Sequence, residues 1–244
     1  MNLSYAIIML MGKIYQMLLP QDCKVVGAEH LPQAAKIIAA NHPNCTDTFF
    51  LPWVIKDQLH TLMQGALFHK PVFGWLLTGS GQIPVYREQK EAAAQQACEY
   101  LANGETVLIY PEAQWNPENK RMKGKSGAVR MSLATGAPII PLGIYVADEN
   151  TRWVRVNDHG KLRQARWQIK GRCYLCFGEP WLPSAETQRD VDPSLIHTLT
   201  DHLMDKIYDQ TQLAILESRL DLPVKRSPAG FGLAGMHAAE SYSG

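Results

Sequence analysis

Short apolar runs alternate with longer amphipathic stretches over most of the chain. Apolar runs of about four to eight residues are typical of buried strands, and apolar residues that recur every three or four positions are typical of helices. Strands are predicted at residues 23–28, 36–40, 62–63, 83–86, 106–110, 139–146 and 166–173. Helices are predicted at residues 3–19, 49–59, 71–78, 88–101 and 192–216, with a further helix that opens at 123–127 and runs to 134. Because helices and strands alternate, we expect an α/β fold with a mostly parallel central sheet flanked by helices.

The first apolar stretch, residues 3–19, ends at Pro20 and contains one charged residue, Lys13. It is short for a membrane span, which needs about 20 apolar residues and tolerates a central charge poorly. A helix that lies flat at a membrane surface would let the Lys13 ammonium reach water. We therefore expect an N-terminal membrane-contacting helix. The alternatives are a helix packed against the core or a partner, and a true span.

Composition divides the chain into three parts. Residues 1–20 form the apolar helix, residues 21–218 carry the alternation of one α/β domain, and residues 219–244 are predicted to be a flexible tail rich in Pro, Gly, Ala and Ser. A chain of 244 residues with 46% hydrophobic content is long enough for one substantial core.

Charge and cysteine usage exclude several classes of function. A net charge of +1, from 24 Lys plus Arg and 23 Asp plus Glu, gives no field that would attract nucleic acid, and no nucleic-acid motif occurs. Five scattered cysteines and the lack of a recognisable cleavable signal peptide predict a reducing, cytoplasmic setting. Cys173 and Cys176 are three positions apart, so in an extended segment they face opposite sides. We expect no metal and no cofactor.

A candidate acid–base pair follows the predicted strand 36–40, where His42 is followed five residues later by Asp47. In a regular helix this spacing would place the two side chains about 140° apart, whereas a strand-to-turn-to-helix junction lets them meet. A carboxylate that accepts a hydrogen bond from one ring nitrogen leaves the other nitrogen free to deprotonate a hydroxyl. The alternative is that His42 and Asp47 only cap a turn and a helix.

Two further candidates also follow predicted strands. Arg87 comes after the strand at 83–86, and Glu112 comes after the strand at 106–110. Ligands of parallel sheets bind at the carboxyl ends of the strands, so we expect His42, Arg87 and Glu112 to converge on one crevice. The planar guanidinium of Arg87 suits an anion, although an ordinary surface arginine is the alternative.

Basic residues at two other places are candidates for anion binding. Lys125 stands at the start of a predicted helix, where free amides favour anions. The Gly-Lys-Ser triplet there is not a phosphate loop, because Asn119 occupies the place of the first glycine of that motif. Residues 152–172 hold seven basic residues and one acid, so the strand at 166–173 could rest on anionic lipid or an acidic carrier protein. An ordinary solvated edge strand is the alternative.

Four ordered blocks of the sequence resemble the glycerolipid acyltransferase family typified by 1-acylglycerol-3-phosphate acyltransferase. The blocks are residues 42–47, 81–87, 110–112 and 138–141, and the resemblance runs from about residue 25 to residue 180. It implies transfer of a fatty acyl group from a coenzyme A or acyl-carrier-protein thioester to a hydroxyl acceptor, with no cofactor. It also implies an acyl-accepting groove and a place at the cytoplasmic face of a membrane.

The resemblance assigns roles by position. His42 is similar to the general base of the family and Asp47 to its orienting partner. Arg87 is similar to the residue that binds the acceptor phosphate, Glu112 falls in the acceptor-binding position of the third block, and Gly81 belongs to the second block.

The third block departs from the family pattern. The family usually continues Pro-Glu-Gly-Thr-Arg, whereas residues 111–115 read Pro-Glu-Ala-Gln-Trp. Exchanging an arginine for Trp115 removes a charge-assisted contact and adds a large apolar face. The acceptor is therefore either a phosphate bound by Arg87 and Lys125, or a less charged alcohol beside Trp115.

Three other mechanisms use the same residues. Cys45 and His42 could form a nucleophile pair that makes an acyl-enzyme. His42 could activate water, which would make the protein a thioester hydrolase. Alternatively, the protein is a lipid-binding module that has the fold but no catalytic activity.

Overall fold

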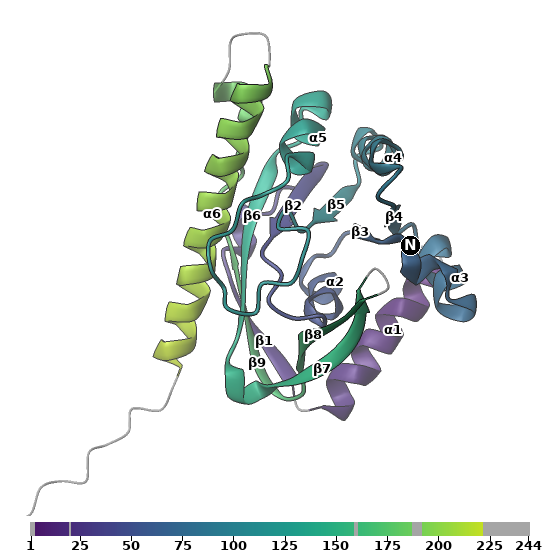
Figure 1. The fold of residues 1–244 in the computed structure, drawn as a ribbon. Helices are drawn as coiled ribbons and strands as arrows, with labels where there is room; N and C mark the ends of the chain where they lie inside the picture. The colour runs from purple at the N-terminus through teal and green to yellow at the C-terminus, as the bar shows by residue number, and fades with distance from the viewer. Residues whose placement is uncertain (1–2, 20, 159–160, 187–191, 222–244) are drawn as a thin grey trace, which may run out of the picture.

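Within residues 3–19, 21–158, 161–186 and 192–221, which the computed structural model describes, a seven-stranded sheet forms the centre of the molecule (Figure 1). Its strands, in spatial order, are β1 (Gln21–Val26), β9 (Gly171–Phe177), β6 (Ile139–Val146), β2 (Lys36–Ala40), β5 (Thr106–Ile109), β3 (Leu59–Gln64) and β4 (Ile83–Val85). A separate antiparallel hairpin is formed by β7 (Thr151–Asp158) and β8 (Lys161–Gln168).

The sheet is mostly parallel, as predicted. β2 pairs in parallel with β5 and β6, and β3 pairs in parallel with β5 and β4. β1 and β9 are parallel to each other, but β9 runs antiparallel to β6. The carboxyl ends of β2, β5, β3 and β4 therefore lie at one edge of the sheet.

Helices cover both faces of this sheet. The α-helices are α1 (Leu3–Leu18), α2 (Leu51–Val54), α3 (Pro71–Gly79), α4 (Lys90–Ala102), α5 (Gly127–Thr135) and α6 (Pro193–Leu220). Short 3-10 helices occur at Ala28–His30, Asp47–Phe49, Gly65–His69, Asp148–Asn150 and Pro183–Glu186. Ile37 and Ala39 of β2 pack into the apolar cluster that holds α4, α5 and α6, whereas Ile38 and Ala40 face the cluster that holds α2. This alternation is what a strand buried on both faces requires.

Several predicted elements are confirmed closely. β2 and β6 have the predicted ends, and β4 lies at the sheet edge, where Pro84 needs no ladder partner for its missing N–H. The predicted apolar stripe of α6 is buried: Ile196, Leu199, Leu203, Ile207 and Ala214. The Asp192 carboxylate caps this helix by accepting a hydrogen bond from the Leu195 N–H at 2.7 Å. Of the predicted tail at 219–244, residues 219 and 220 belong to α6, and the part from residue 222 lies outside the described residues.

The predicted helix at 49–59 is wrong. The segment forms a 3-10 turn and the single turn of α2, and β3 already begins at Leu59. The chain has to return to the amino end of the sheet, where Asp57 is bound to the buried Lys36 ammonium and accepts a hydrogen bond from Thr106. A continuous helix would carry Asp57 away from these partners, so tertiary contacts override the local apolar pattern.

The predicted strand at 166–173, with its basic outer face, is also wrong. The segment is split between β8 and β9 by a turn at Gly171, whose φ is 75°. Arg166 is buried, and its guanidinium donates hydrogen bonds to the carbonyls of Pro117 and Val146. The alternation of charged and apolar residues in this segment does not show that Arg166 is buried while the neighbouring basic residues are exposed. Cys173 and Cys176, in contrast, face opposite apolar clusters as predicted.

Helix α1 turns its polar and small residues toward the protein and its apolar residues outward. Tyr5 and Gly12 are buried, the Tyr5 hydroxyl accepts a hydrogen bond from the Leu59 N–H, and Tyr15 donates one to the carbonyl of Gln168. The exposed large side chains are Leu3, Leu10, Met11, Ile14, Met17 and Leu18. At 3.6 residues per turn they share an arc of about 120°. Of the described helices, none combines the length and the apolar character that crossing a bilayer requires.

Candidate active site

His42 lies in the turn after β2, and its imidazole ring contacts the Asp47 carboxylate. Nδ1 of His42 is 3.1 Å from Oδ2 of Asp47. β2 ends at Ala40, and the chain then turns back on itself before the 3-10 helix that begins at Asp47. The predicted contact between the two side chains is confirmed.

The surroundings of Asp47 fix the tautomer of His42. Asp47 is 2% exposed, and its two carboxylate oxygens accept hydrogen bonds from the backbone N–H and the side-chain amide of Asn44, at 2.9 and 3.2 Å. With the carboxylate as acceptor, Nδ1 of His42 carries the proton, so Nε2 has the free lone pair. The His42 side chain is 19% exposed, which gives this ring access from outside.

Two further elements hold the turn in place. The Tyr110 ring, at the end of β5, stacks on the imidazole of His42 with ring centres 4.1 Å apart. From β8, the Arg166 carbonyl accepts a hydrogen bond from the Cys45 N–H at 3.0 Å, and the Gln168 N–H donates one to the Thr46 hydroxyl at 3.3 Å. The imidazole is thus held by its carboxylate partner, by a stacked ring and by a braced backbone.

Glu112 is buried behind His42, and both of its carboxylate oxygens are used inside the protein. Oε2 accepts a hydrogen bond from the His42 N–H at 3.0 Å, and Oε1 accepts one from the Asn116 amide at 2.6 Å. Burial raises the pKa of Glu112 to about 7, against the two hydrogen bonds and the nearby His42, which lower it. The side chain therefore links the His42 turn to the loop after β5.

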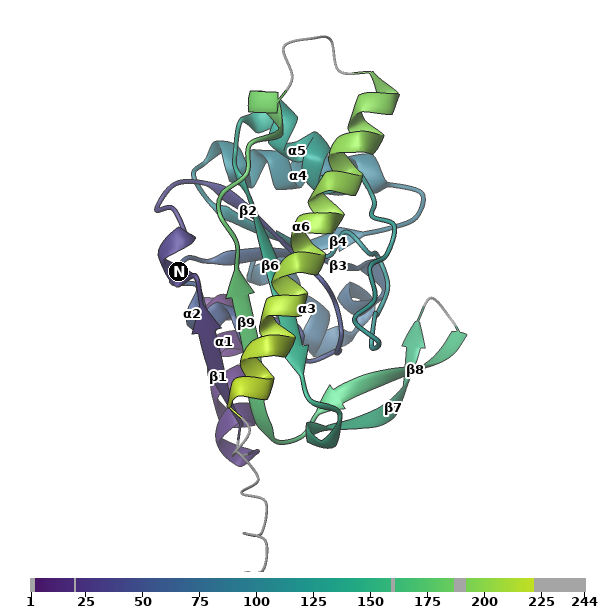
Figure 2. The same ribbon diagram turned by 90° about the vertical axis from the view of Figure 1, so that its left-hand side faces the viewer.

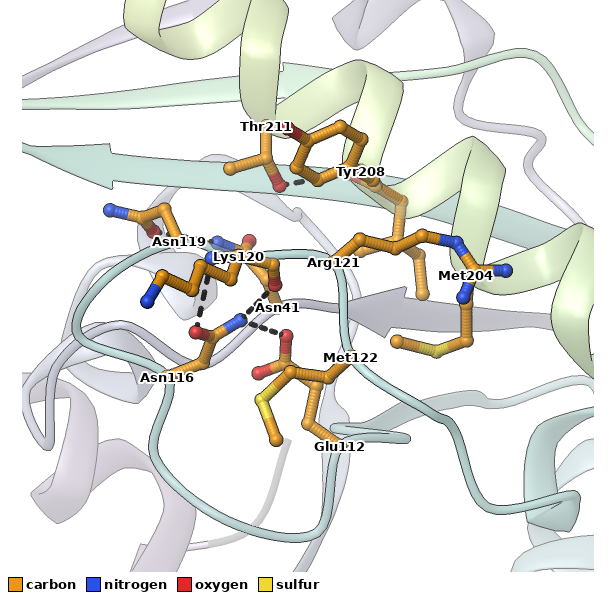
Figure 3. Close-up of a pocket in the computed structure, with 11 residues that line it drawn as sticks. Asn41, Glu112, Asn116, Asn119, Lys120, Arg121, Met122, Met204, Tyr208 and Thr211 are labelled. Carbon is orange, nitrogen blue, oxygen red and sulfur yellow. Dashed lines mark hydrogen bonds between the residues drawn. The ribbon is translucent and has the colours of Figure 1, made fainter.

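The loop at 113–126 is folded over this link (Figure 3). The Asn116 N–H donates a hydrogen bond to the His42 carbonyl at 2.8 Å, while its side-chain amide also reaches the Lys120 carbonyl. On the far side, Arg121 forms an ion pair with Asp205 of α6. A narrow cavity lies between this loop and α6, with Glu112 at its inner wall.

Ala113 adopts a backbone conformation that favours glycine. Its φ is 55°, in the left-handed region, at the position where the resembling family usually has glycine. We expect Ala113→Gly to raise the free energy of unfolding by up to about 1 kcal/mol, because relief of strain exceeds the added unfolded-chain entropy. Urea denaturation measures this change in the free energy of unfolding.

Ala92→Gly on the exposed side of α4 is the matched control and should lower the free energy of unfolding by about 1 kcal/mol. Equal losses for both variants would contradict the strain.

Trp115 lies near the pair, and Lys125 lies beside the segment that follows β5. The Trp115 ring centre is 6.3 Å from that of His42. The Lys125 N–H donates a hydrogen bond to the Pro111 carbonyl at 2.8 Å, which places the exposed Lys125 next to the end of β5 and just before α5.

Arg87 and Gly81 are not brought together with His42. Arg87 follows β4, three strand positions from β2, and lines a pocket of about 210 Å³ with His69 and Tyr86. β3 stands between β4 and β5, so Arg87 shares the carboxyl edge of the sheet with His42 and Glu112 at a distance, and the single crevice stays a prediction. Gly81 precedes β4, at the opposite end of that strand from Arg87. Its φ of 76° and a side chain of His60 that would clash with a Cβ there explain why glycine occupies the position.

The Cys45 thiol does not face His42. Its Sγ donates a hydrogen bond to the Arg166 carbonyl, and burial, followed by the charge of Asp47, raises the pKa of the thiol to about 12. A neutral thiol is a poor nucleophile, so this environment speaks against an acyl-enzyme on Cys45. Among the described residues no group of three or more His, Cys, Asp or Glu side chains is placed to hold a metal ion.

Sequence reasoning missed the stacking of Tyr110 and the bracing by Asn44 and Asn116. The parallel register of β2 with β5, in which Ala39 pairs with Ile109, brings the next residues of the two strands together. Strand order would have revealed the contact between Tyr110 and His42. Asn116 lies in a polar loop whose path no local pattern indicates.

Comparison with known proteins identifies a family and a shared fold. The acyltransferase family model matches residues 22–145. A 1-acyl-sn-glycerol-3-phosphate acyltransferase of Pseudomonas aeruginosa is 30% identical over 123 residues, which cover 49% of this chain and 48% of that protein. One of Borreliella burgdorferi is 30% identical over 131 residues and half of each chain. The crystal structure of the 1-acyl-sn-glycerophosphate acyltransferase PlsC from Thermotoga maritima has a TM-score of 0.61 and 21% identity, covering 85% of this chain and 79% of that one.

The overall α/β fold, with its mostly parallel central sheet flanked by helices, is thus shared with that crystal structure. The chain belongs to the acyltransferase family, whose model matches the chain from β1 through β6. It spans about half the length of the curated relatives it matches.

Proposed function

We propose that the protein is an O-acyltransferase that moves a fatty acyl group from a coenzyme A or acyl-carrier-protein thioester to a lipid hydroxyl. Membership of the acyltransferase family supports this proposal, and the names of the relatives favour 1-acylglycerol-3-phosphate as the acceptor. The contact between His42 Nδ1 and Asp47 Oδ2 is the observation that carries it.

In the proposed reaction, Nε2 of His42 takes the proton of the acceptor hydroxyl as the oxygen attacks the thioester carbonyl. Asp47 stabilises the imidazolium that forms, as a buried carboxylate next to Nδ1 can do. The tetrahedral intermediate then collapses, the carbon–sulfur bond breaks and the thiolate leaves. No covalent enzyme intermediate is needed.

The other predicted site residues divide into two proposed roles. Arg87 follows β4, which lies about 14 Å from β2 at about 4.8 Å per strand spacing, and we propose that its long side chain binds an acceptor phosphate. Lys125 and Trp115 are proposed to line the acceptor site next to His42. Glu112 has both oxygens engaged internally, so we assign it to holding the His42 turn and not to contact with the acceptor.

The outward apolar face of α1 is proposed to lie on the cytoplasmic surface of a membrane, where the lipid acceptor of such a reaction is found. Each large apolar side chain that moves from water into the acyl region contributes about 1.5 to 3 kcal/mol when fully buried. The six exposed side chains of α1 are sufficient for peripheral attachment.

A thiol-release assay with a panel of acceptors tests the proposed reaction. We expect release of thiol from an acyl thioester to require a lipid alcohol, with an acylated alcohol as the product by mass spectrometry. A phosphorylated acceptor should be preferred, and Arg87→Ala should raise the KM for that acceptor about tenfold through loss of a charge-assisted contact. Free fatty acid formed without any acceptor would instead establish a hydrolase. If no acceptor supports thiol release, both enzyme functions are contradicted and the lipid-binding module is the remaining alternative.

A further inference from the structure

Helix α3 exposes large apolar side chains to solvent. Val72 is 73% exposed and Trp75 is 62% exposed, and these two residues stand three positions apart on one face of the helix. Phe73 is 36% exposed. Gly74, Leu76 and Leu77 of the same helix are buried. The helix is therefore well packed, and its exposed apolar residues are not needed for that packing.

Helix α3 is a direct neighbour of α1. The two helices are in contact, since a Cβ on Gly79 of α3 would lie 2.4 Å from the hydroxyl of Ser4 in α1. Both lie on the side of the molecule away from α6 (Figures 1 and 2). Trp53 of α2 is 41% exposed, packs near Gly12 of α1 and carries the Lys13 ammonium over its ring. We call the exposed apolar residues of α1 and α3, with Trp53, the α1–α3 surface.

The segments that carry α1 and α3 hold no acidic residue, although Asp57 and Glu88 flank the second of them. Residues 1–21 and 58–87 contain no aspartate or glutamate, although the chain has 23 acidic residues in all. The cations in these segments are Lys13, Lys70 and Arg87, and Lys70 is exposed at the start of α3. An apolar surface with basic side chains and no acids is complementary to a bilayer that contains anionic lipid.

We propose that α3 is a second membrane-docking element, so that the whole α1–α3 surface rests on an anionic bilayer. The pocket beside Arg87 is lined by Glu88 and also by Gly65, Ala66 and His69, which belong to the 3-10 helix leading directly into α3. Docking through α3 therefore brings the mouth of this pocket to the membrane surface. An anionic lipid headgroup then reaches Arg87 from the bilayer; this last step rests on the proposed function, whereas the docking does not.

A second copy of the chain fits this surface less well than a bilayer does. In a symmetric dimer the same patch meets itself, so the interface would hold Lys13 and Lys70 of both copies. The surface has no acidic side chain to pair with them. Anionic headgroups supply the missing charge.

Vesicle co-sedimentation with the full chain tests the docking. The probes are vesicles of phosphatidylcholine alone and of phosphatidylcholine mixed with phosphatidylglycerol. We expect the double variant Val72→Ser/Trp75→Ser to bind mixed vesicles at least about tenfold more weakly, since two apolar side chains no longer enter the bilayer. Lys70→Glu should reduce the preference for mixed vesicles. Leu220→Ser is the matched control, because Leu220 is 67% exposed at the end of α6, and it should bind like the parent protein.

The outcomes separate the docking from the proposed function. If the α3 double variant binds as tightly as the parent while Leu10→Ser/Ile14→Ser does not, α1 docks alone and the proposal for α3 is overturned. A parent protein that sediments as a dimer, which the α3 double variant converts to a monomer, also overturns it. The α3 double variant should keep its thiol-release rate on detergent-dispersed acceptor. Failure of the parent protein in that assay counts against the proposed function and leaves the vesicle result unaffected.

Discussion

Replacing His42 with alanine is expected to lower kcat for acyl transfer about 1,000-fold, with little change in the KM of the thioester. General-base catalysis by a positioned side chain contributes about 100-fold to 10,000-fold, and the alanine variant removes the proton acceptor while leaving the rest of the site. The rate of thiol release at saturating acceptor measures the effect. Circular dichroism should show an unchanged fold, because His42 is partly exposed and its ring supports no core cluster.

The chain offers a matched control for this experiment. His197 and Asp201 on α6 also form a pair with Nδ1 and Oδ2 3.1 Å apart, but the His197 side chain is 72% exposed on a helix surface. His197→Ala should therefore leave kcat unchanged. If His42→Ala retains full activity, or if both histidine variants lose it equally, the proposed base is wrong.

Exchanging Glu112 for glutamine is expected to reduce both stability and turnover. Both carboxylate oxygens accept hydrogen bonds from N–H donors, and the orientation of the Asn116 amide is fixed by its bonds with the Lys120 backbone. The NH2 group of glutamine would have to face one of those donors, so we expect a loss of about 1 to 3 kcal/mol in unfolding free energy. The His42 turn would also shift, and displacement of about 1 Å at a reacting group costs about 100-fold in rate.

The kinetic pattern distinguishes the positioning role from acceptor binding. A residue that holds the His42 turn lowers kcat, whereas a residue that binds the acceptor raises its KM. Glu99→Gln is the matched control, because the exposed Glu99 carboxylate also accepts a hydrogen bond from an amide, that of Gln95. It should change neither quantity. A Glu112→Gln protein with normal stability and only a raised acceptor KM would contradict the positioning role.

The same variant changes the pH dependence of stability. Burial raises the pKa of Glu112 from 4.5 to about 7, so the folded protein holds a proton that the unfolded chain has already released. The free energy of unfolding therefore falls as pH rises from about 4.5 to about 7, by up to about 3 kcal/mol at 1.4 kcal/mol per pKa unit. Glutamine does not titrate, so the decline over this window should be smaller in the Glu112→Gln protein.

The sequence predicted the parts of the fold that depend on local pattern. β2 and β6 are continuous apolar runs buried on both faces, and α6 has an unbroken apolar stripe, so each can be recognised without knowing its neighbours. The segment at 49–59 shows the limit of this approach. Its apolar residues fit a helix, but Asp57 is bound to Lys36 and Thr106 at the other end of the sheet.

The candidate site was predictable only where the chain itself brings residues together. His42 and Asp47 are five positions apart, so the geometry of one turn decides their contact. The distance from Arg87 to His42 depends instead on strand order, which places β3 and β5 between them. The internal use of Glu112 depends on the path of the loop at 113–126, which no periodicity in the sequence indicates.

The most direct test of the central claim is a double-mutant cycle on His42 and Asp47, read as the rate of acceptor-dependent thiol release. If Asp47 acts only by orienting and stabilising the His42 imidazole, Asp47→Asn alone slows the reaction, but His42→Ala/Asp47→Asn is no slower than His42→Ala. Losses that multiply in the double variant would show that the two side chains act independently, which would contradict the proposed pair.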